Sequence, residues 1–163
     1  MACAAAGLAV ASGAMAQERP ACAIYDELVA TASSGFPQLK GQLIPGTNNG
    51  FQSKRMLESM YCAMTGGEAS AFVCISDEMA EAEARRAYDV RLSRLRACFE
   101  GWETAPLLDV PGRGHMVDSL RFVSRLDGGL LSIGAMIGFE DVEGVAQWRA
   151  GFGVSWKPDD VAV

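Results

Sequence analysis

The chain has 163 residues, of which 50% are apolar and 21% are charged. This composition predicts a single packed domain and excludes the strongly charged, weakly apolar mixture of disordered proteins. The formal net charge is −6, which argues against nucleic acid as a partner because a phosphate backbone calls for a basic surface. An acidic chain is compatible with a basic protein as partner.

The first sixteen residues carry no charged side chain and end in the small-residue pattern Ala14-Met15-Ala16. This pattern predicts a signal peptide over residues 1–16, cleaved before Gln17. Residues 17–163 would then form one exported domain in the bacterial periplasm or outside the cell. The run lacks the basic residue that usually opens a leader, and the alternative is a buried N-terminal helix. No other stretch is long and apolar enough to cross a membrane as a helix.

Removal of the leader takes Cys3 and leaves four cysteines. In an oxidising compartment we expect them to form two disulfides, for which three connectivities exist. Zinc is the alternative, but the chain has no Cys-x-x-Cys pair and a single histidine, too few ligands for a zinc centre. A glycine-rich phosphate loop is also missing, so we expect no metal and no cofactor. The four disulfide candidates are Cys22, Cys62, Cys74 and Cys98.

The first predicted element is a helix over residues 22–33, where apolar residues recur at helical spacing. Gly35 and Pro37 end it, because glycine accepts the left-handed cap and proline cannot continue a helix. The stretch that follows, to Gly50, is rich in glycine, proline and asparagine. It predicts loop and turn, with at most a short strand at 43–44.

A β-hairpin is predicted next, from two apolar runs between residues 54 and 76 that flank Gly66-Gly67. A loop of about five residues would place Cys62 and Cys74 opposite each other, at a distance that suits a disulfide. A tight two-glycine turn would shift them apart and forbid the bond.

A second helix is predicted from Ser76, as its side-chain cap, to Phe99. Acidic residues lie near its start and basic residues near its end, which suits the helix dipole. Apolar side chains recur at intervals of four, three and four and predict one buried stripe, formed by Tyr88, Leu92, Leu95 and Phe99. If the two helices pack antiparallel, Cys22 lies beside Cys98 and the two can pair.

The last third alternates between apolar and small or polar residues over 119–125, 131–139 and 146–156. This period of two predicts three strands, joined by turns at 127–129 and 140–144. Several outward-facing positions of the last two strands are glycine, which suggests bulging or the close approach of another surface.

These elements together predict an α+β fold stapled by disulfides. Two helices would pack on one face of an antiparallel sheet of about five strands, in the order α-β-β-α-β-β-β.

Candidates for chemistry are few. His115 is the only side chain that titrates near neutrality when unperturbed, and it follows Arg113 in a glycine-rich stretch. Glu140, Asp141 and Glu143 cluster in one predicted turn. No nucleophile motif such as Gly-x-Ser-x-Gly accompanies them, so an exposed turn histidine and solvated acids are the simpler interpretation. We predict no catalytic residue and keep these five as weak site candidates.

Mainly by elimination, the sequence favours a non-enzymatic, protein-binding or inhibitor-type module. One alternative is a hydrolase of envelope material, in which His115 works with a carboxylate of the turn at 140–144 within hydrogen-bond reach. Another is a carrier of a small apolar ligand, in which Trp148, Phe152 and Trp156 line a cavity instead of meeting the helices.

Overall fold

The computed structural model describes residues 22–67, 69–106, 114–126 and 128–159. The predicted leader at 1–16 and the candidate Arg113 lie outside these residues. The described part holds two α-helices, one 3-10 helix and eight strands. All eight strands form one antiparallel sheet in the order β1-β2-β3-β4-β8-β7-β6-β5.

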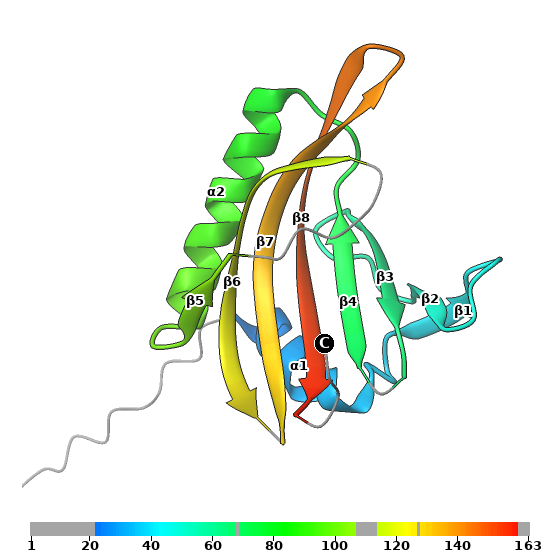
Figure 1. The fold of residues 1–163 in the computed structure, drawn as a ribbon, viewed down its shortest axis with the longest axis vertical. Coiled ribbons are helices and arrows are strands. Elements are labelled where there is room, and N and C mark those ends of the chain that lie inside the picture. The colour runs from blue at the N-terminus through cyan, green and yellow to red at the C-terminus, as the bar shows by residue number, and fades with distance from the viewer. Residues whose placement is uncertain (1–21, 68, 107–113, 127, 160–163) are drawn as a thin grey trace, which may run out of the picture.

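Four strands precede the second helix and four follow it (Figure 1). They are β1 (Lys40–Leu43), β2 (Gly50–Ser53), β3 (Tyr61–Thr65), β4 (Ser70–Ile75), β5 (Glu103–Ala105), β6 (His115–Leu126), β7 (Gly129–Val142) and β8 (Val145–Pro158).

The first helix, α1, spans Ala23–Thr31 and continues as the 3-10 helix η1 over Ala32–Ser34. Gly35 closes it with a φ of 77°, the left-handed cap that glycine adopts without steric cost. This confirms the first predicted helix. The second helix, α2, spans Glu81–Cys98 and packs against β7 and β8.

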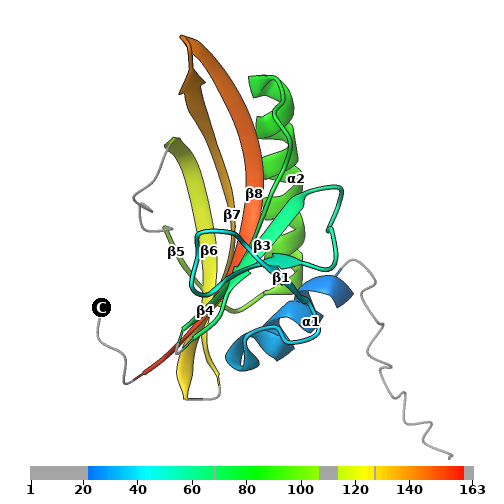
Figure 2. The same cartoon turned by 90° about the vertical axis from the view of Figure 1, so that its right-hand side faces the viewer.

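Both α-helices lie on one side of the sheet (Figure 2). The large apolar side chains that alternate along the last strands point to this side and are buried there; they include Phe122 of β6, Ile133 and Ile137 of β7, and Phe152 and Val154 of β8. We call this the covered face and its opposite the outer face. The predicted alternation of the last three strands is therefore confirmed.

Two disulfides staple the covered side. Cys62 lies directly opposite Cys74 in the β3–β4 ladder, and the two are bonded with their Cα atoms 4.1 Å apart. The second bond joins Cys22 to Cys98, so it ties the start of α1 to the end of α2. Both predicted pairings are confirmed. The helices are not packed side by side, since α1 lies near the C-terminal end of α2 and points away from its length (Figure 2).

The predicted count of five strands is wrong, because it leaves out β1, β2 and β5; the short strand considered at 43–44 only touches the end of β1. Each has only three or four residues; β1 lies in the glycine-rich stretch that predicts loop, and β2 begins at its end. An alternation of apolar and polar residues can be recognised only in longer strands. These short strands form because neighbouring strands of the sheet offer them hydrogen-bonding partners.

The second helix begins at Glu81, with Ala80 at its N-cap position, four residues later than the predicted cap Ser76. The Ser76 hydroxyl accepts a hydrogen bond from the Ala150 backbone N–H at 3.1 Å, and Met79 forms a β-bridge with Trp148. Pairing with β8 thus holds residues 76–79 extended, and the helix starts only where that pairing stops.

The β7–β8 hairpin is longer than predicted. Its ladder continues to Val142 opposite Val145, and the turn consists of Glu143 and Gly144 alone, with φ values of 55° and 82°. Two positive φ values are the mark of the type I′ turn, whose twist matches the flanking strands. The predicted turn at 140–144 is therefore too long: its acids at 140 and 141 belong to β7.

Candidate functional site

A groove of about 580 Å³ lies on the outer face of the sheet. Figure 2 places α1 and α2 on the opposite side, so no helix of the described chain fills it. We call it the outer groove. Strands β4, β6, β7 and β8 line it, chiefly through Ala71, Val73, Ile75, His115, Met116, Arg121, Ser132, Gly134, Met136, Gly138, Glu140, Gln147, Arg149, Gly151, Gly153 and Ser155.

The register of the strands explains why the floor of the groove is low. Gly134 of β7 lies opposite Gly153 of β8, and the next cross-strand pair on the same face is Met136 with Gly151. Because alternate residues of a strand point to the same side, the glycines stand where outward side chains would otherwise fill this face. The groove is thus the counterpart of the packed core: the same strands carry large residues on one face and glycine on the other.

Some of these glycines also allow the sheet to curl. A Cβ on Gly134 would lie 2.6 Å from the Leu120 carbonyl oxygen of β6, and one on Gly138 would lie 2.6 Å from that of His115. Such contacts are too close for any side chain, so the neighbouring strand approaches only because these residues are glycine. Figure 2 shows β6 on the side of β7 and β8 that faces away from the helices. The close approach makes the outer face concave.

Gly153 differs from these positions. A Cβ there would meet its nearest neighbours, among them the Met136 methyl group and the Phe72 carbonyl oxygen, at 3.5 Å, which is ordinary van der Waals distance. A side chain at residue 153 would therefore fill the groove without pushing strands apart.

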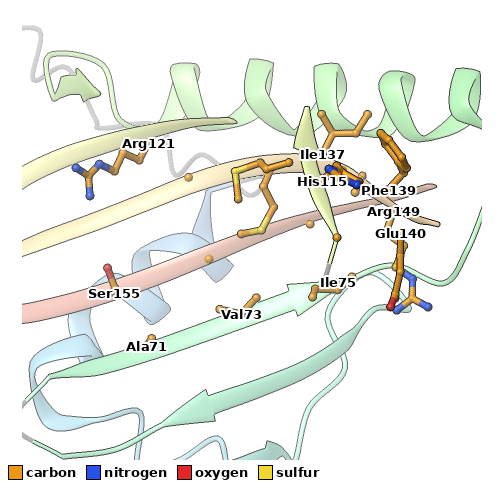
Figure 3. A pocket seen from close by; sticks show the side chains of 18 of the residues that line it. Ala71, Val73, Ile75, His115, Arg121, Ile137, Phe139, Glu140, Arg149 and Ser155 are labelled. Atoms are coloured by element: carbon orange, nitrogen blue, oxygen red, sulfur yellow. The ribbon is translucent and has the colours of Figure 1, made fainter. Parts of the chain in front are cut away.

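The two ends of the groove differ in their polar groups (Figure 3). Arg121 and Ser155 lie at one end, and the Ser155 hydroxyl is hydrogen-bonded to that of Ser132 at 2.8 Å. Arg149 lies at the other end, where a contact of 2.8 Å with the Glu78 carboxylate neutralises it. Within the described residues, Arg121 has no ion pair, and its buried Nε makes no hydrogen bond.

The outer face is basic although the chain is acidic. Arg121, Arg125, Arg149 and Lys157 all occupy outward positions by the alternation of β6 and β8. Within the described ranges, the outward positions of β4 to β8 carry two acids. Glu140 lies at the Arg149 end, and Glu103 lies opposite Val123, beside Arg121, without an ion pair. Two bases are neutralised, since Arg125 pairs with Asp159 as Arg149 does with Glu78. Positive charge therefore remains at the Arg121 end.

Among the predicted site residues that the structure describes, His115 and Glu140 lie at one end of the groove, but no ion pair joins His115 to a carboxylate. His115 is exposed, its ring lies 5.0 Å from that of Phe139, and it makes no ion pair with a carboxylate of the described chain. Glu140 lines the same end of the groove (Figure 3), whereas Asp141 and Glu143 are exposed near the hairpin tip. The Asp141 carboxylate accepts a hydrogen bond from the Gly144 N–H at 2.8 Å, which is a turn-stabilising role.

The aromatic face expected to line a carrier's cavity meets the helices and the core instead. Phe152 is 1% exposed, and its ring centroid lies 5.6 Å from that of Tyr25 in α1 and 6.4 Å from that of Phe72 in β4. Trp148 and Trp156 pack against the same core. The groove is on the other face, where the outward glycines were its one sign in the sequence.

No helix in the described ranges is long and apolar enough to span a bilayer. In the same residues, no three or more His, Cys, Asp and Glu side chains gather as metal ligands would. Comparison of the chain with known protein families, with curated proteins and with solved structures finds no match.

Proposed function

We propose that the protein is a non-enzymatic binding module that holds an extended segment of a partner protein in the outer groove. The observation that carries the proposal is a concave, mostly apolar groove on a sheet face that no described helix covers. Monomeric proteins rarely leave such apolar concavities open unless they bind something there.

The shape of the groove favours a polypeptide segment. Its lining follows β8 from Gln147 to Ser155, which is roughly 27 Å at the ~3.4 Å rise of an antiparallel strand. An extended segment of eight or nine residues has the same length. Its alternate side chains would point into the glycine-floored positions around Gly151 and Gly153.

A carrier of a small apolar ligand is the second candidate. It is favoured by the volume of the groove, which falls within the roughly 300–1,000 Å³ range of small-molecule sites. A compact ligand would leave part of the long lining bare, and this ranks the carrier below the partner segment.

We also propose that the protein acts outside the cytosol, after cleavage of residues 1–16. The support is the pair of disulfides, Cys22–Cys98 and Cys62–Cys74, because such bonds persist mainly in oxidising compartments.

The test of the binding function compares three forms of the oxidised protein as bait for an extract of the organism's cell envelope at low salt. One is wild type, one is Gly153→Leu, and one is Gly66→Leu. The second fills the groove. The third adds the same side chain at the β3–β4 turn, where the nearest atom to a Cβ is 3.9 Å away and which lies outside the groove lining.

A partner retained by wild type and by Gly66→Leu, but lost at least about tenfold by Gly153→Leu, supports the proposal. Equal retention by all three forms, or no specific partner for any of them, overturns it. Thermal unfolding of each form establishes that the variants are folded.

A further inference from the structure

We infer that the segment held in the outer groove carries a carboxylate, which pairs with Arg121 while apolar side chains of the segment fill the glycine-floored stretch beside it. This inference rests on the proposed function and names the chemistry of the partner.

The first ground is that Arg121 is placed like a ligand-binding residue. It pairs across β6–β7 with Gly134, whose lack of a side chain lets the Cα and Cβ of Arg121 approach β7 closely, and it lines the groove. Guanidinium groups bind carboxylates through two parallel N–H donors. In the described chain no acid meets this one, and its Nε is buried without a hydrogen bond.

The second ground is the contrast with the other two arginines of this face. Arg149 is held by Glu78 and Arg125 by Asp159, so the protein itself supplies a carboxylate to each. Arg121 stands between them, four residues from Arg125 along the same strand, and receives none from the described residues. An incoming carboxylate would complete the pattern.

The third ground is the pair of serines that lies next to Arg121 across β7 and β8. The hydroxyls of Ser132 and Ser155 are bonded to each other at 2.8 Å and lie two residues from Gly134 and Gly153 on the same face. A hydroxyl can donate to a carboxylate oxygen, whereas the opposite direction from Arg121 is apolar, with Val73, Met136 and Ile75. A ligand that contacts both the Arg121 end and the apolar part of the groove is therefore anionic at one point and apolar along the rest.

This chemistry differs from the basic partner with which the net charge is compatible. Net charge describes the whole surface, whereas recognition depends on the charge at the contact. The acidic partner segment is therefore the sharper expectation for the groove.

The experiment selects a random library of displayed nine-residue peptides on oxidised wild-type protein. Each enriched peptide is synthesised in two forms. The acidic form keeps its Asp or Glu, and the amide form has Asn or Gln at that position. Binding of each pair is measured by titration calorimetry to wild type, Arg121→Gln, Arg121→Lys and Gly153→Leu. Arg125→Gln is the matched control, because it removes a base of the same strand and face outside the groove lining.

We expect winners to share one acidic position flanked by apolar residues. The amide peptide should bind wild type about 10–100-fold more weakly, and Arg121→Gln should weaken the acidic peptide by a similar factor without further effect on the amide peptide. Arg121→Lys should restore part of the affinity, and Arg125→Gln should change it less than about twofold.

Winners that Gly153→Leu blocks, but that show no acidic preference and ignore Arg121→Gln, overturn this inference and leave the proposed function standing. Winners that Gly153→Leu does not affect overturn the proposed function itself. A parallel titration with dodecanoate and dodecanol covers the other source of a carboxylate on an apolar body. If dodecanoate alone binds, and binding is lost in both Gly153→Leu and Arg121→Gln, the polypeptide occupant is wrong and a fatty-acid-like ligand replaces it.

Discussion

The same strands form both faces of the sheet, but one face is packed against the helices and the other is open as a groove. On the covered face, β8 presents Phe152 and Val154 to the helices, and these side chains are 1% exposed. On the outer face, the next residues along the same strand are Gly151 and Gly153, which form the floor of the groove. The comparison teaches that stability and binding are separated here by the side-chain alternation of a strand. Substitutions at Phe152 and at Gly153, one residue apart, should therefore affect one property and spare the other.

The largest effect is expected from removing the disulfide that ties the helices to each other. Replacing Cys22 and Cys98 by serine opens a loop with a sequence separation of 76, whereas the Cys62–Cys74 loop has a separation of 12. The chain-entropy model predicts losses of about 4.5 and about 3 kcal/mol in the free energy of unfolding. Urea titrations of both double-serine variants measure the difference, and a greater loss from the shorter loop would contradict it.

The next effect separates the faces directly. Phe152→Ala should lower the free energy of unfolding by about 4 kcal/mol, because it leaves a cavity between α1, β4 and β8. Gly153→Ala should change it by less than about 1 kcal/mol, because its methyl group meets only ordinary contacts on the outer face. Urea unfolding of the two variants under one buffer condition checks both values. Similar losses in the two would mean that the outer face is packed as well.

Alkaline pH should weaken the covered face through Tyr88 of α2. Burial, with the negative charge of Asp118, raises the pKa of Tyr88 from 10.0 to about 12. The folded state therefore holds the phenolic proton more tightly, so the contribution is complete below pH ~10 and is lost between pH ~10 and ~12, amounting to roughly 2–3 kcal/mol.

Tyr88→Phe should lose less stability than wild type between pH 9 and pH 11.5 in urea titrations. Tyr61→Phe is the control, because the Tyr61 side chain is 53% exposed and should leave the alkaline loss unchanged. An equal loss in wild type and Tyr88→Phe would show that another group causes it.

The smallest effect distinguishes two kinds of glycine on the outer face. Gly134→Ala should cost about 2 kcal/mol, because its Cβ would lie 2.6 Å from the Leu120 carbonyl oxygen and the strands must separate. Gly153→Ala is the matched control. Amide hydrogen exchange along β6 and β7 should be faster in Gly134→Ala alone. Unchanged exchange would mean that the concavity does not depend on this close approach.

Several features followed from the sequence because they are local. The period of two in the last three strands specified which residues face the core, and the spacing of Tyr88, Leu92 and Leu95 specified the buried side of α2. The pairing of Cys62 with Cys74 followed from the length of a single hairpin loop. In each case, neighbours along the chain determine the outcome, so a short window of residues contains the information.

Other features were decided only by tertiary structure. β1, β2 and β5 exist because a longer strand offers them a partner, and Ser76 to Met79 remain extended because β8 pairs with them before α2 can begin. The outward glycines were visible in the sequence, but the groove needed the curl of β6 over β7. Arg121 became a candidate because it forms no ion pair within the described chain, although Glu103 lies on the same face beside it. Strand curvature and the pairing of distant charges depend on contacts between residues far apart in sequence, which no local pattern encodes.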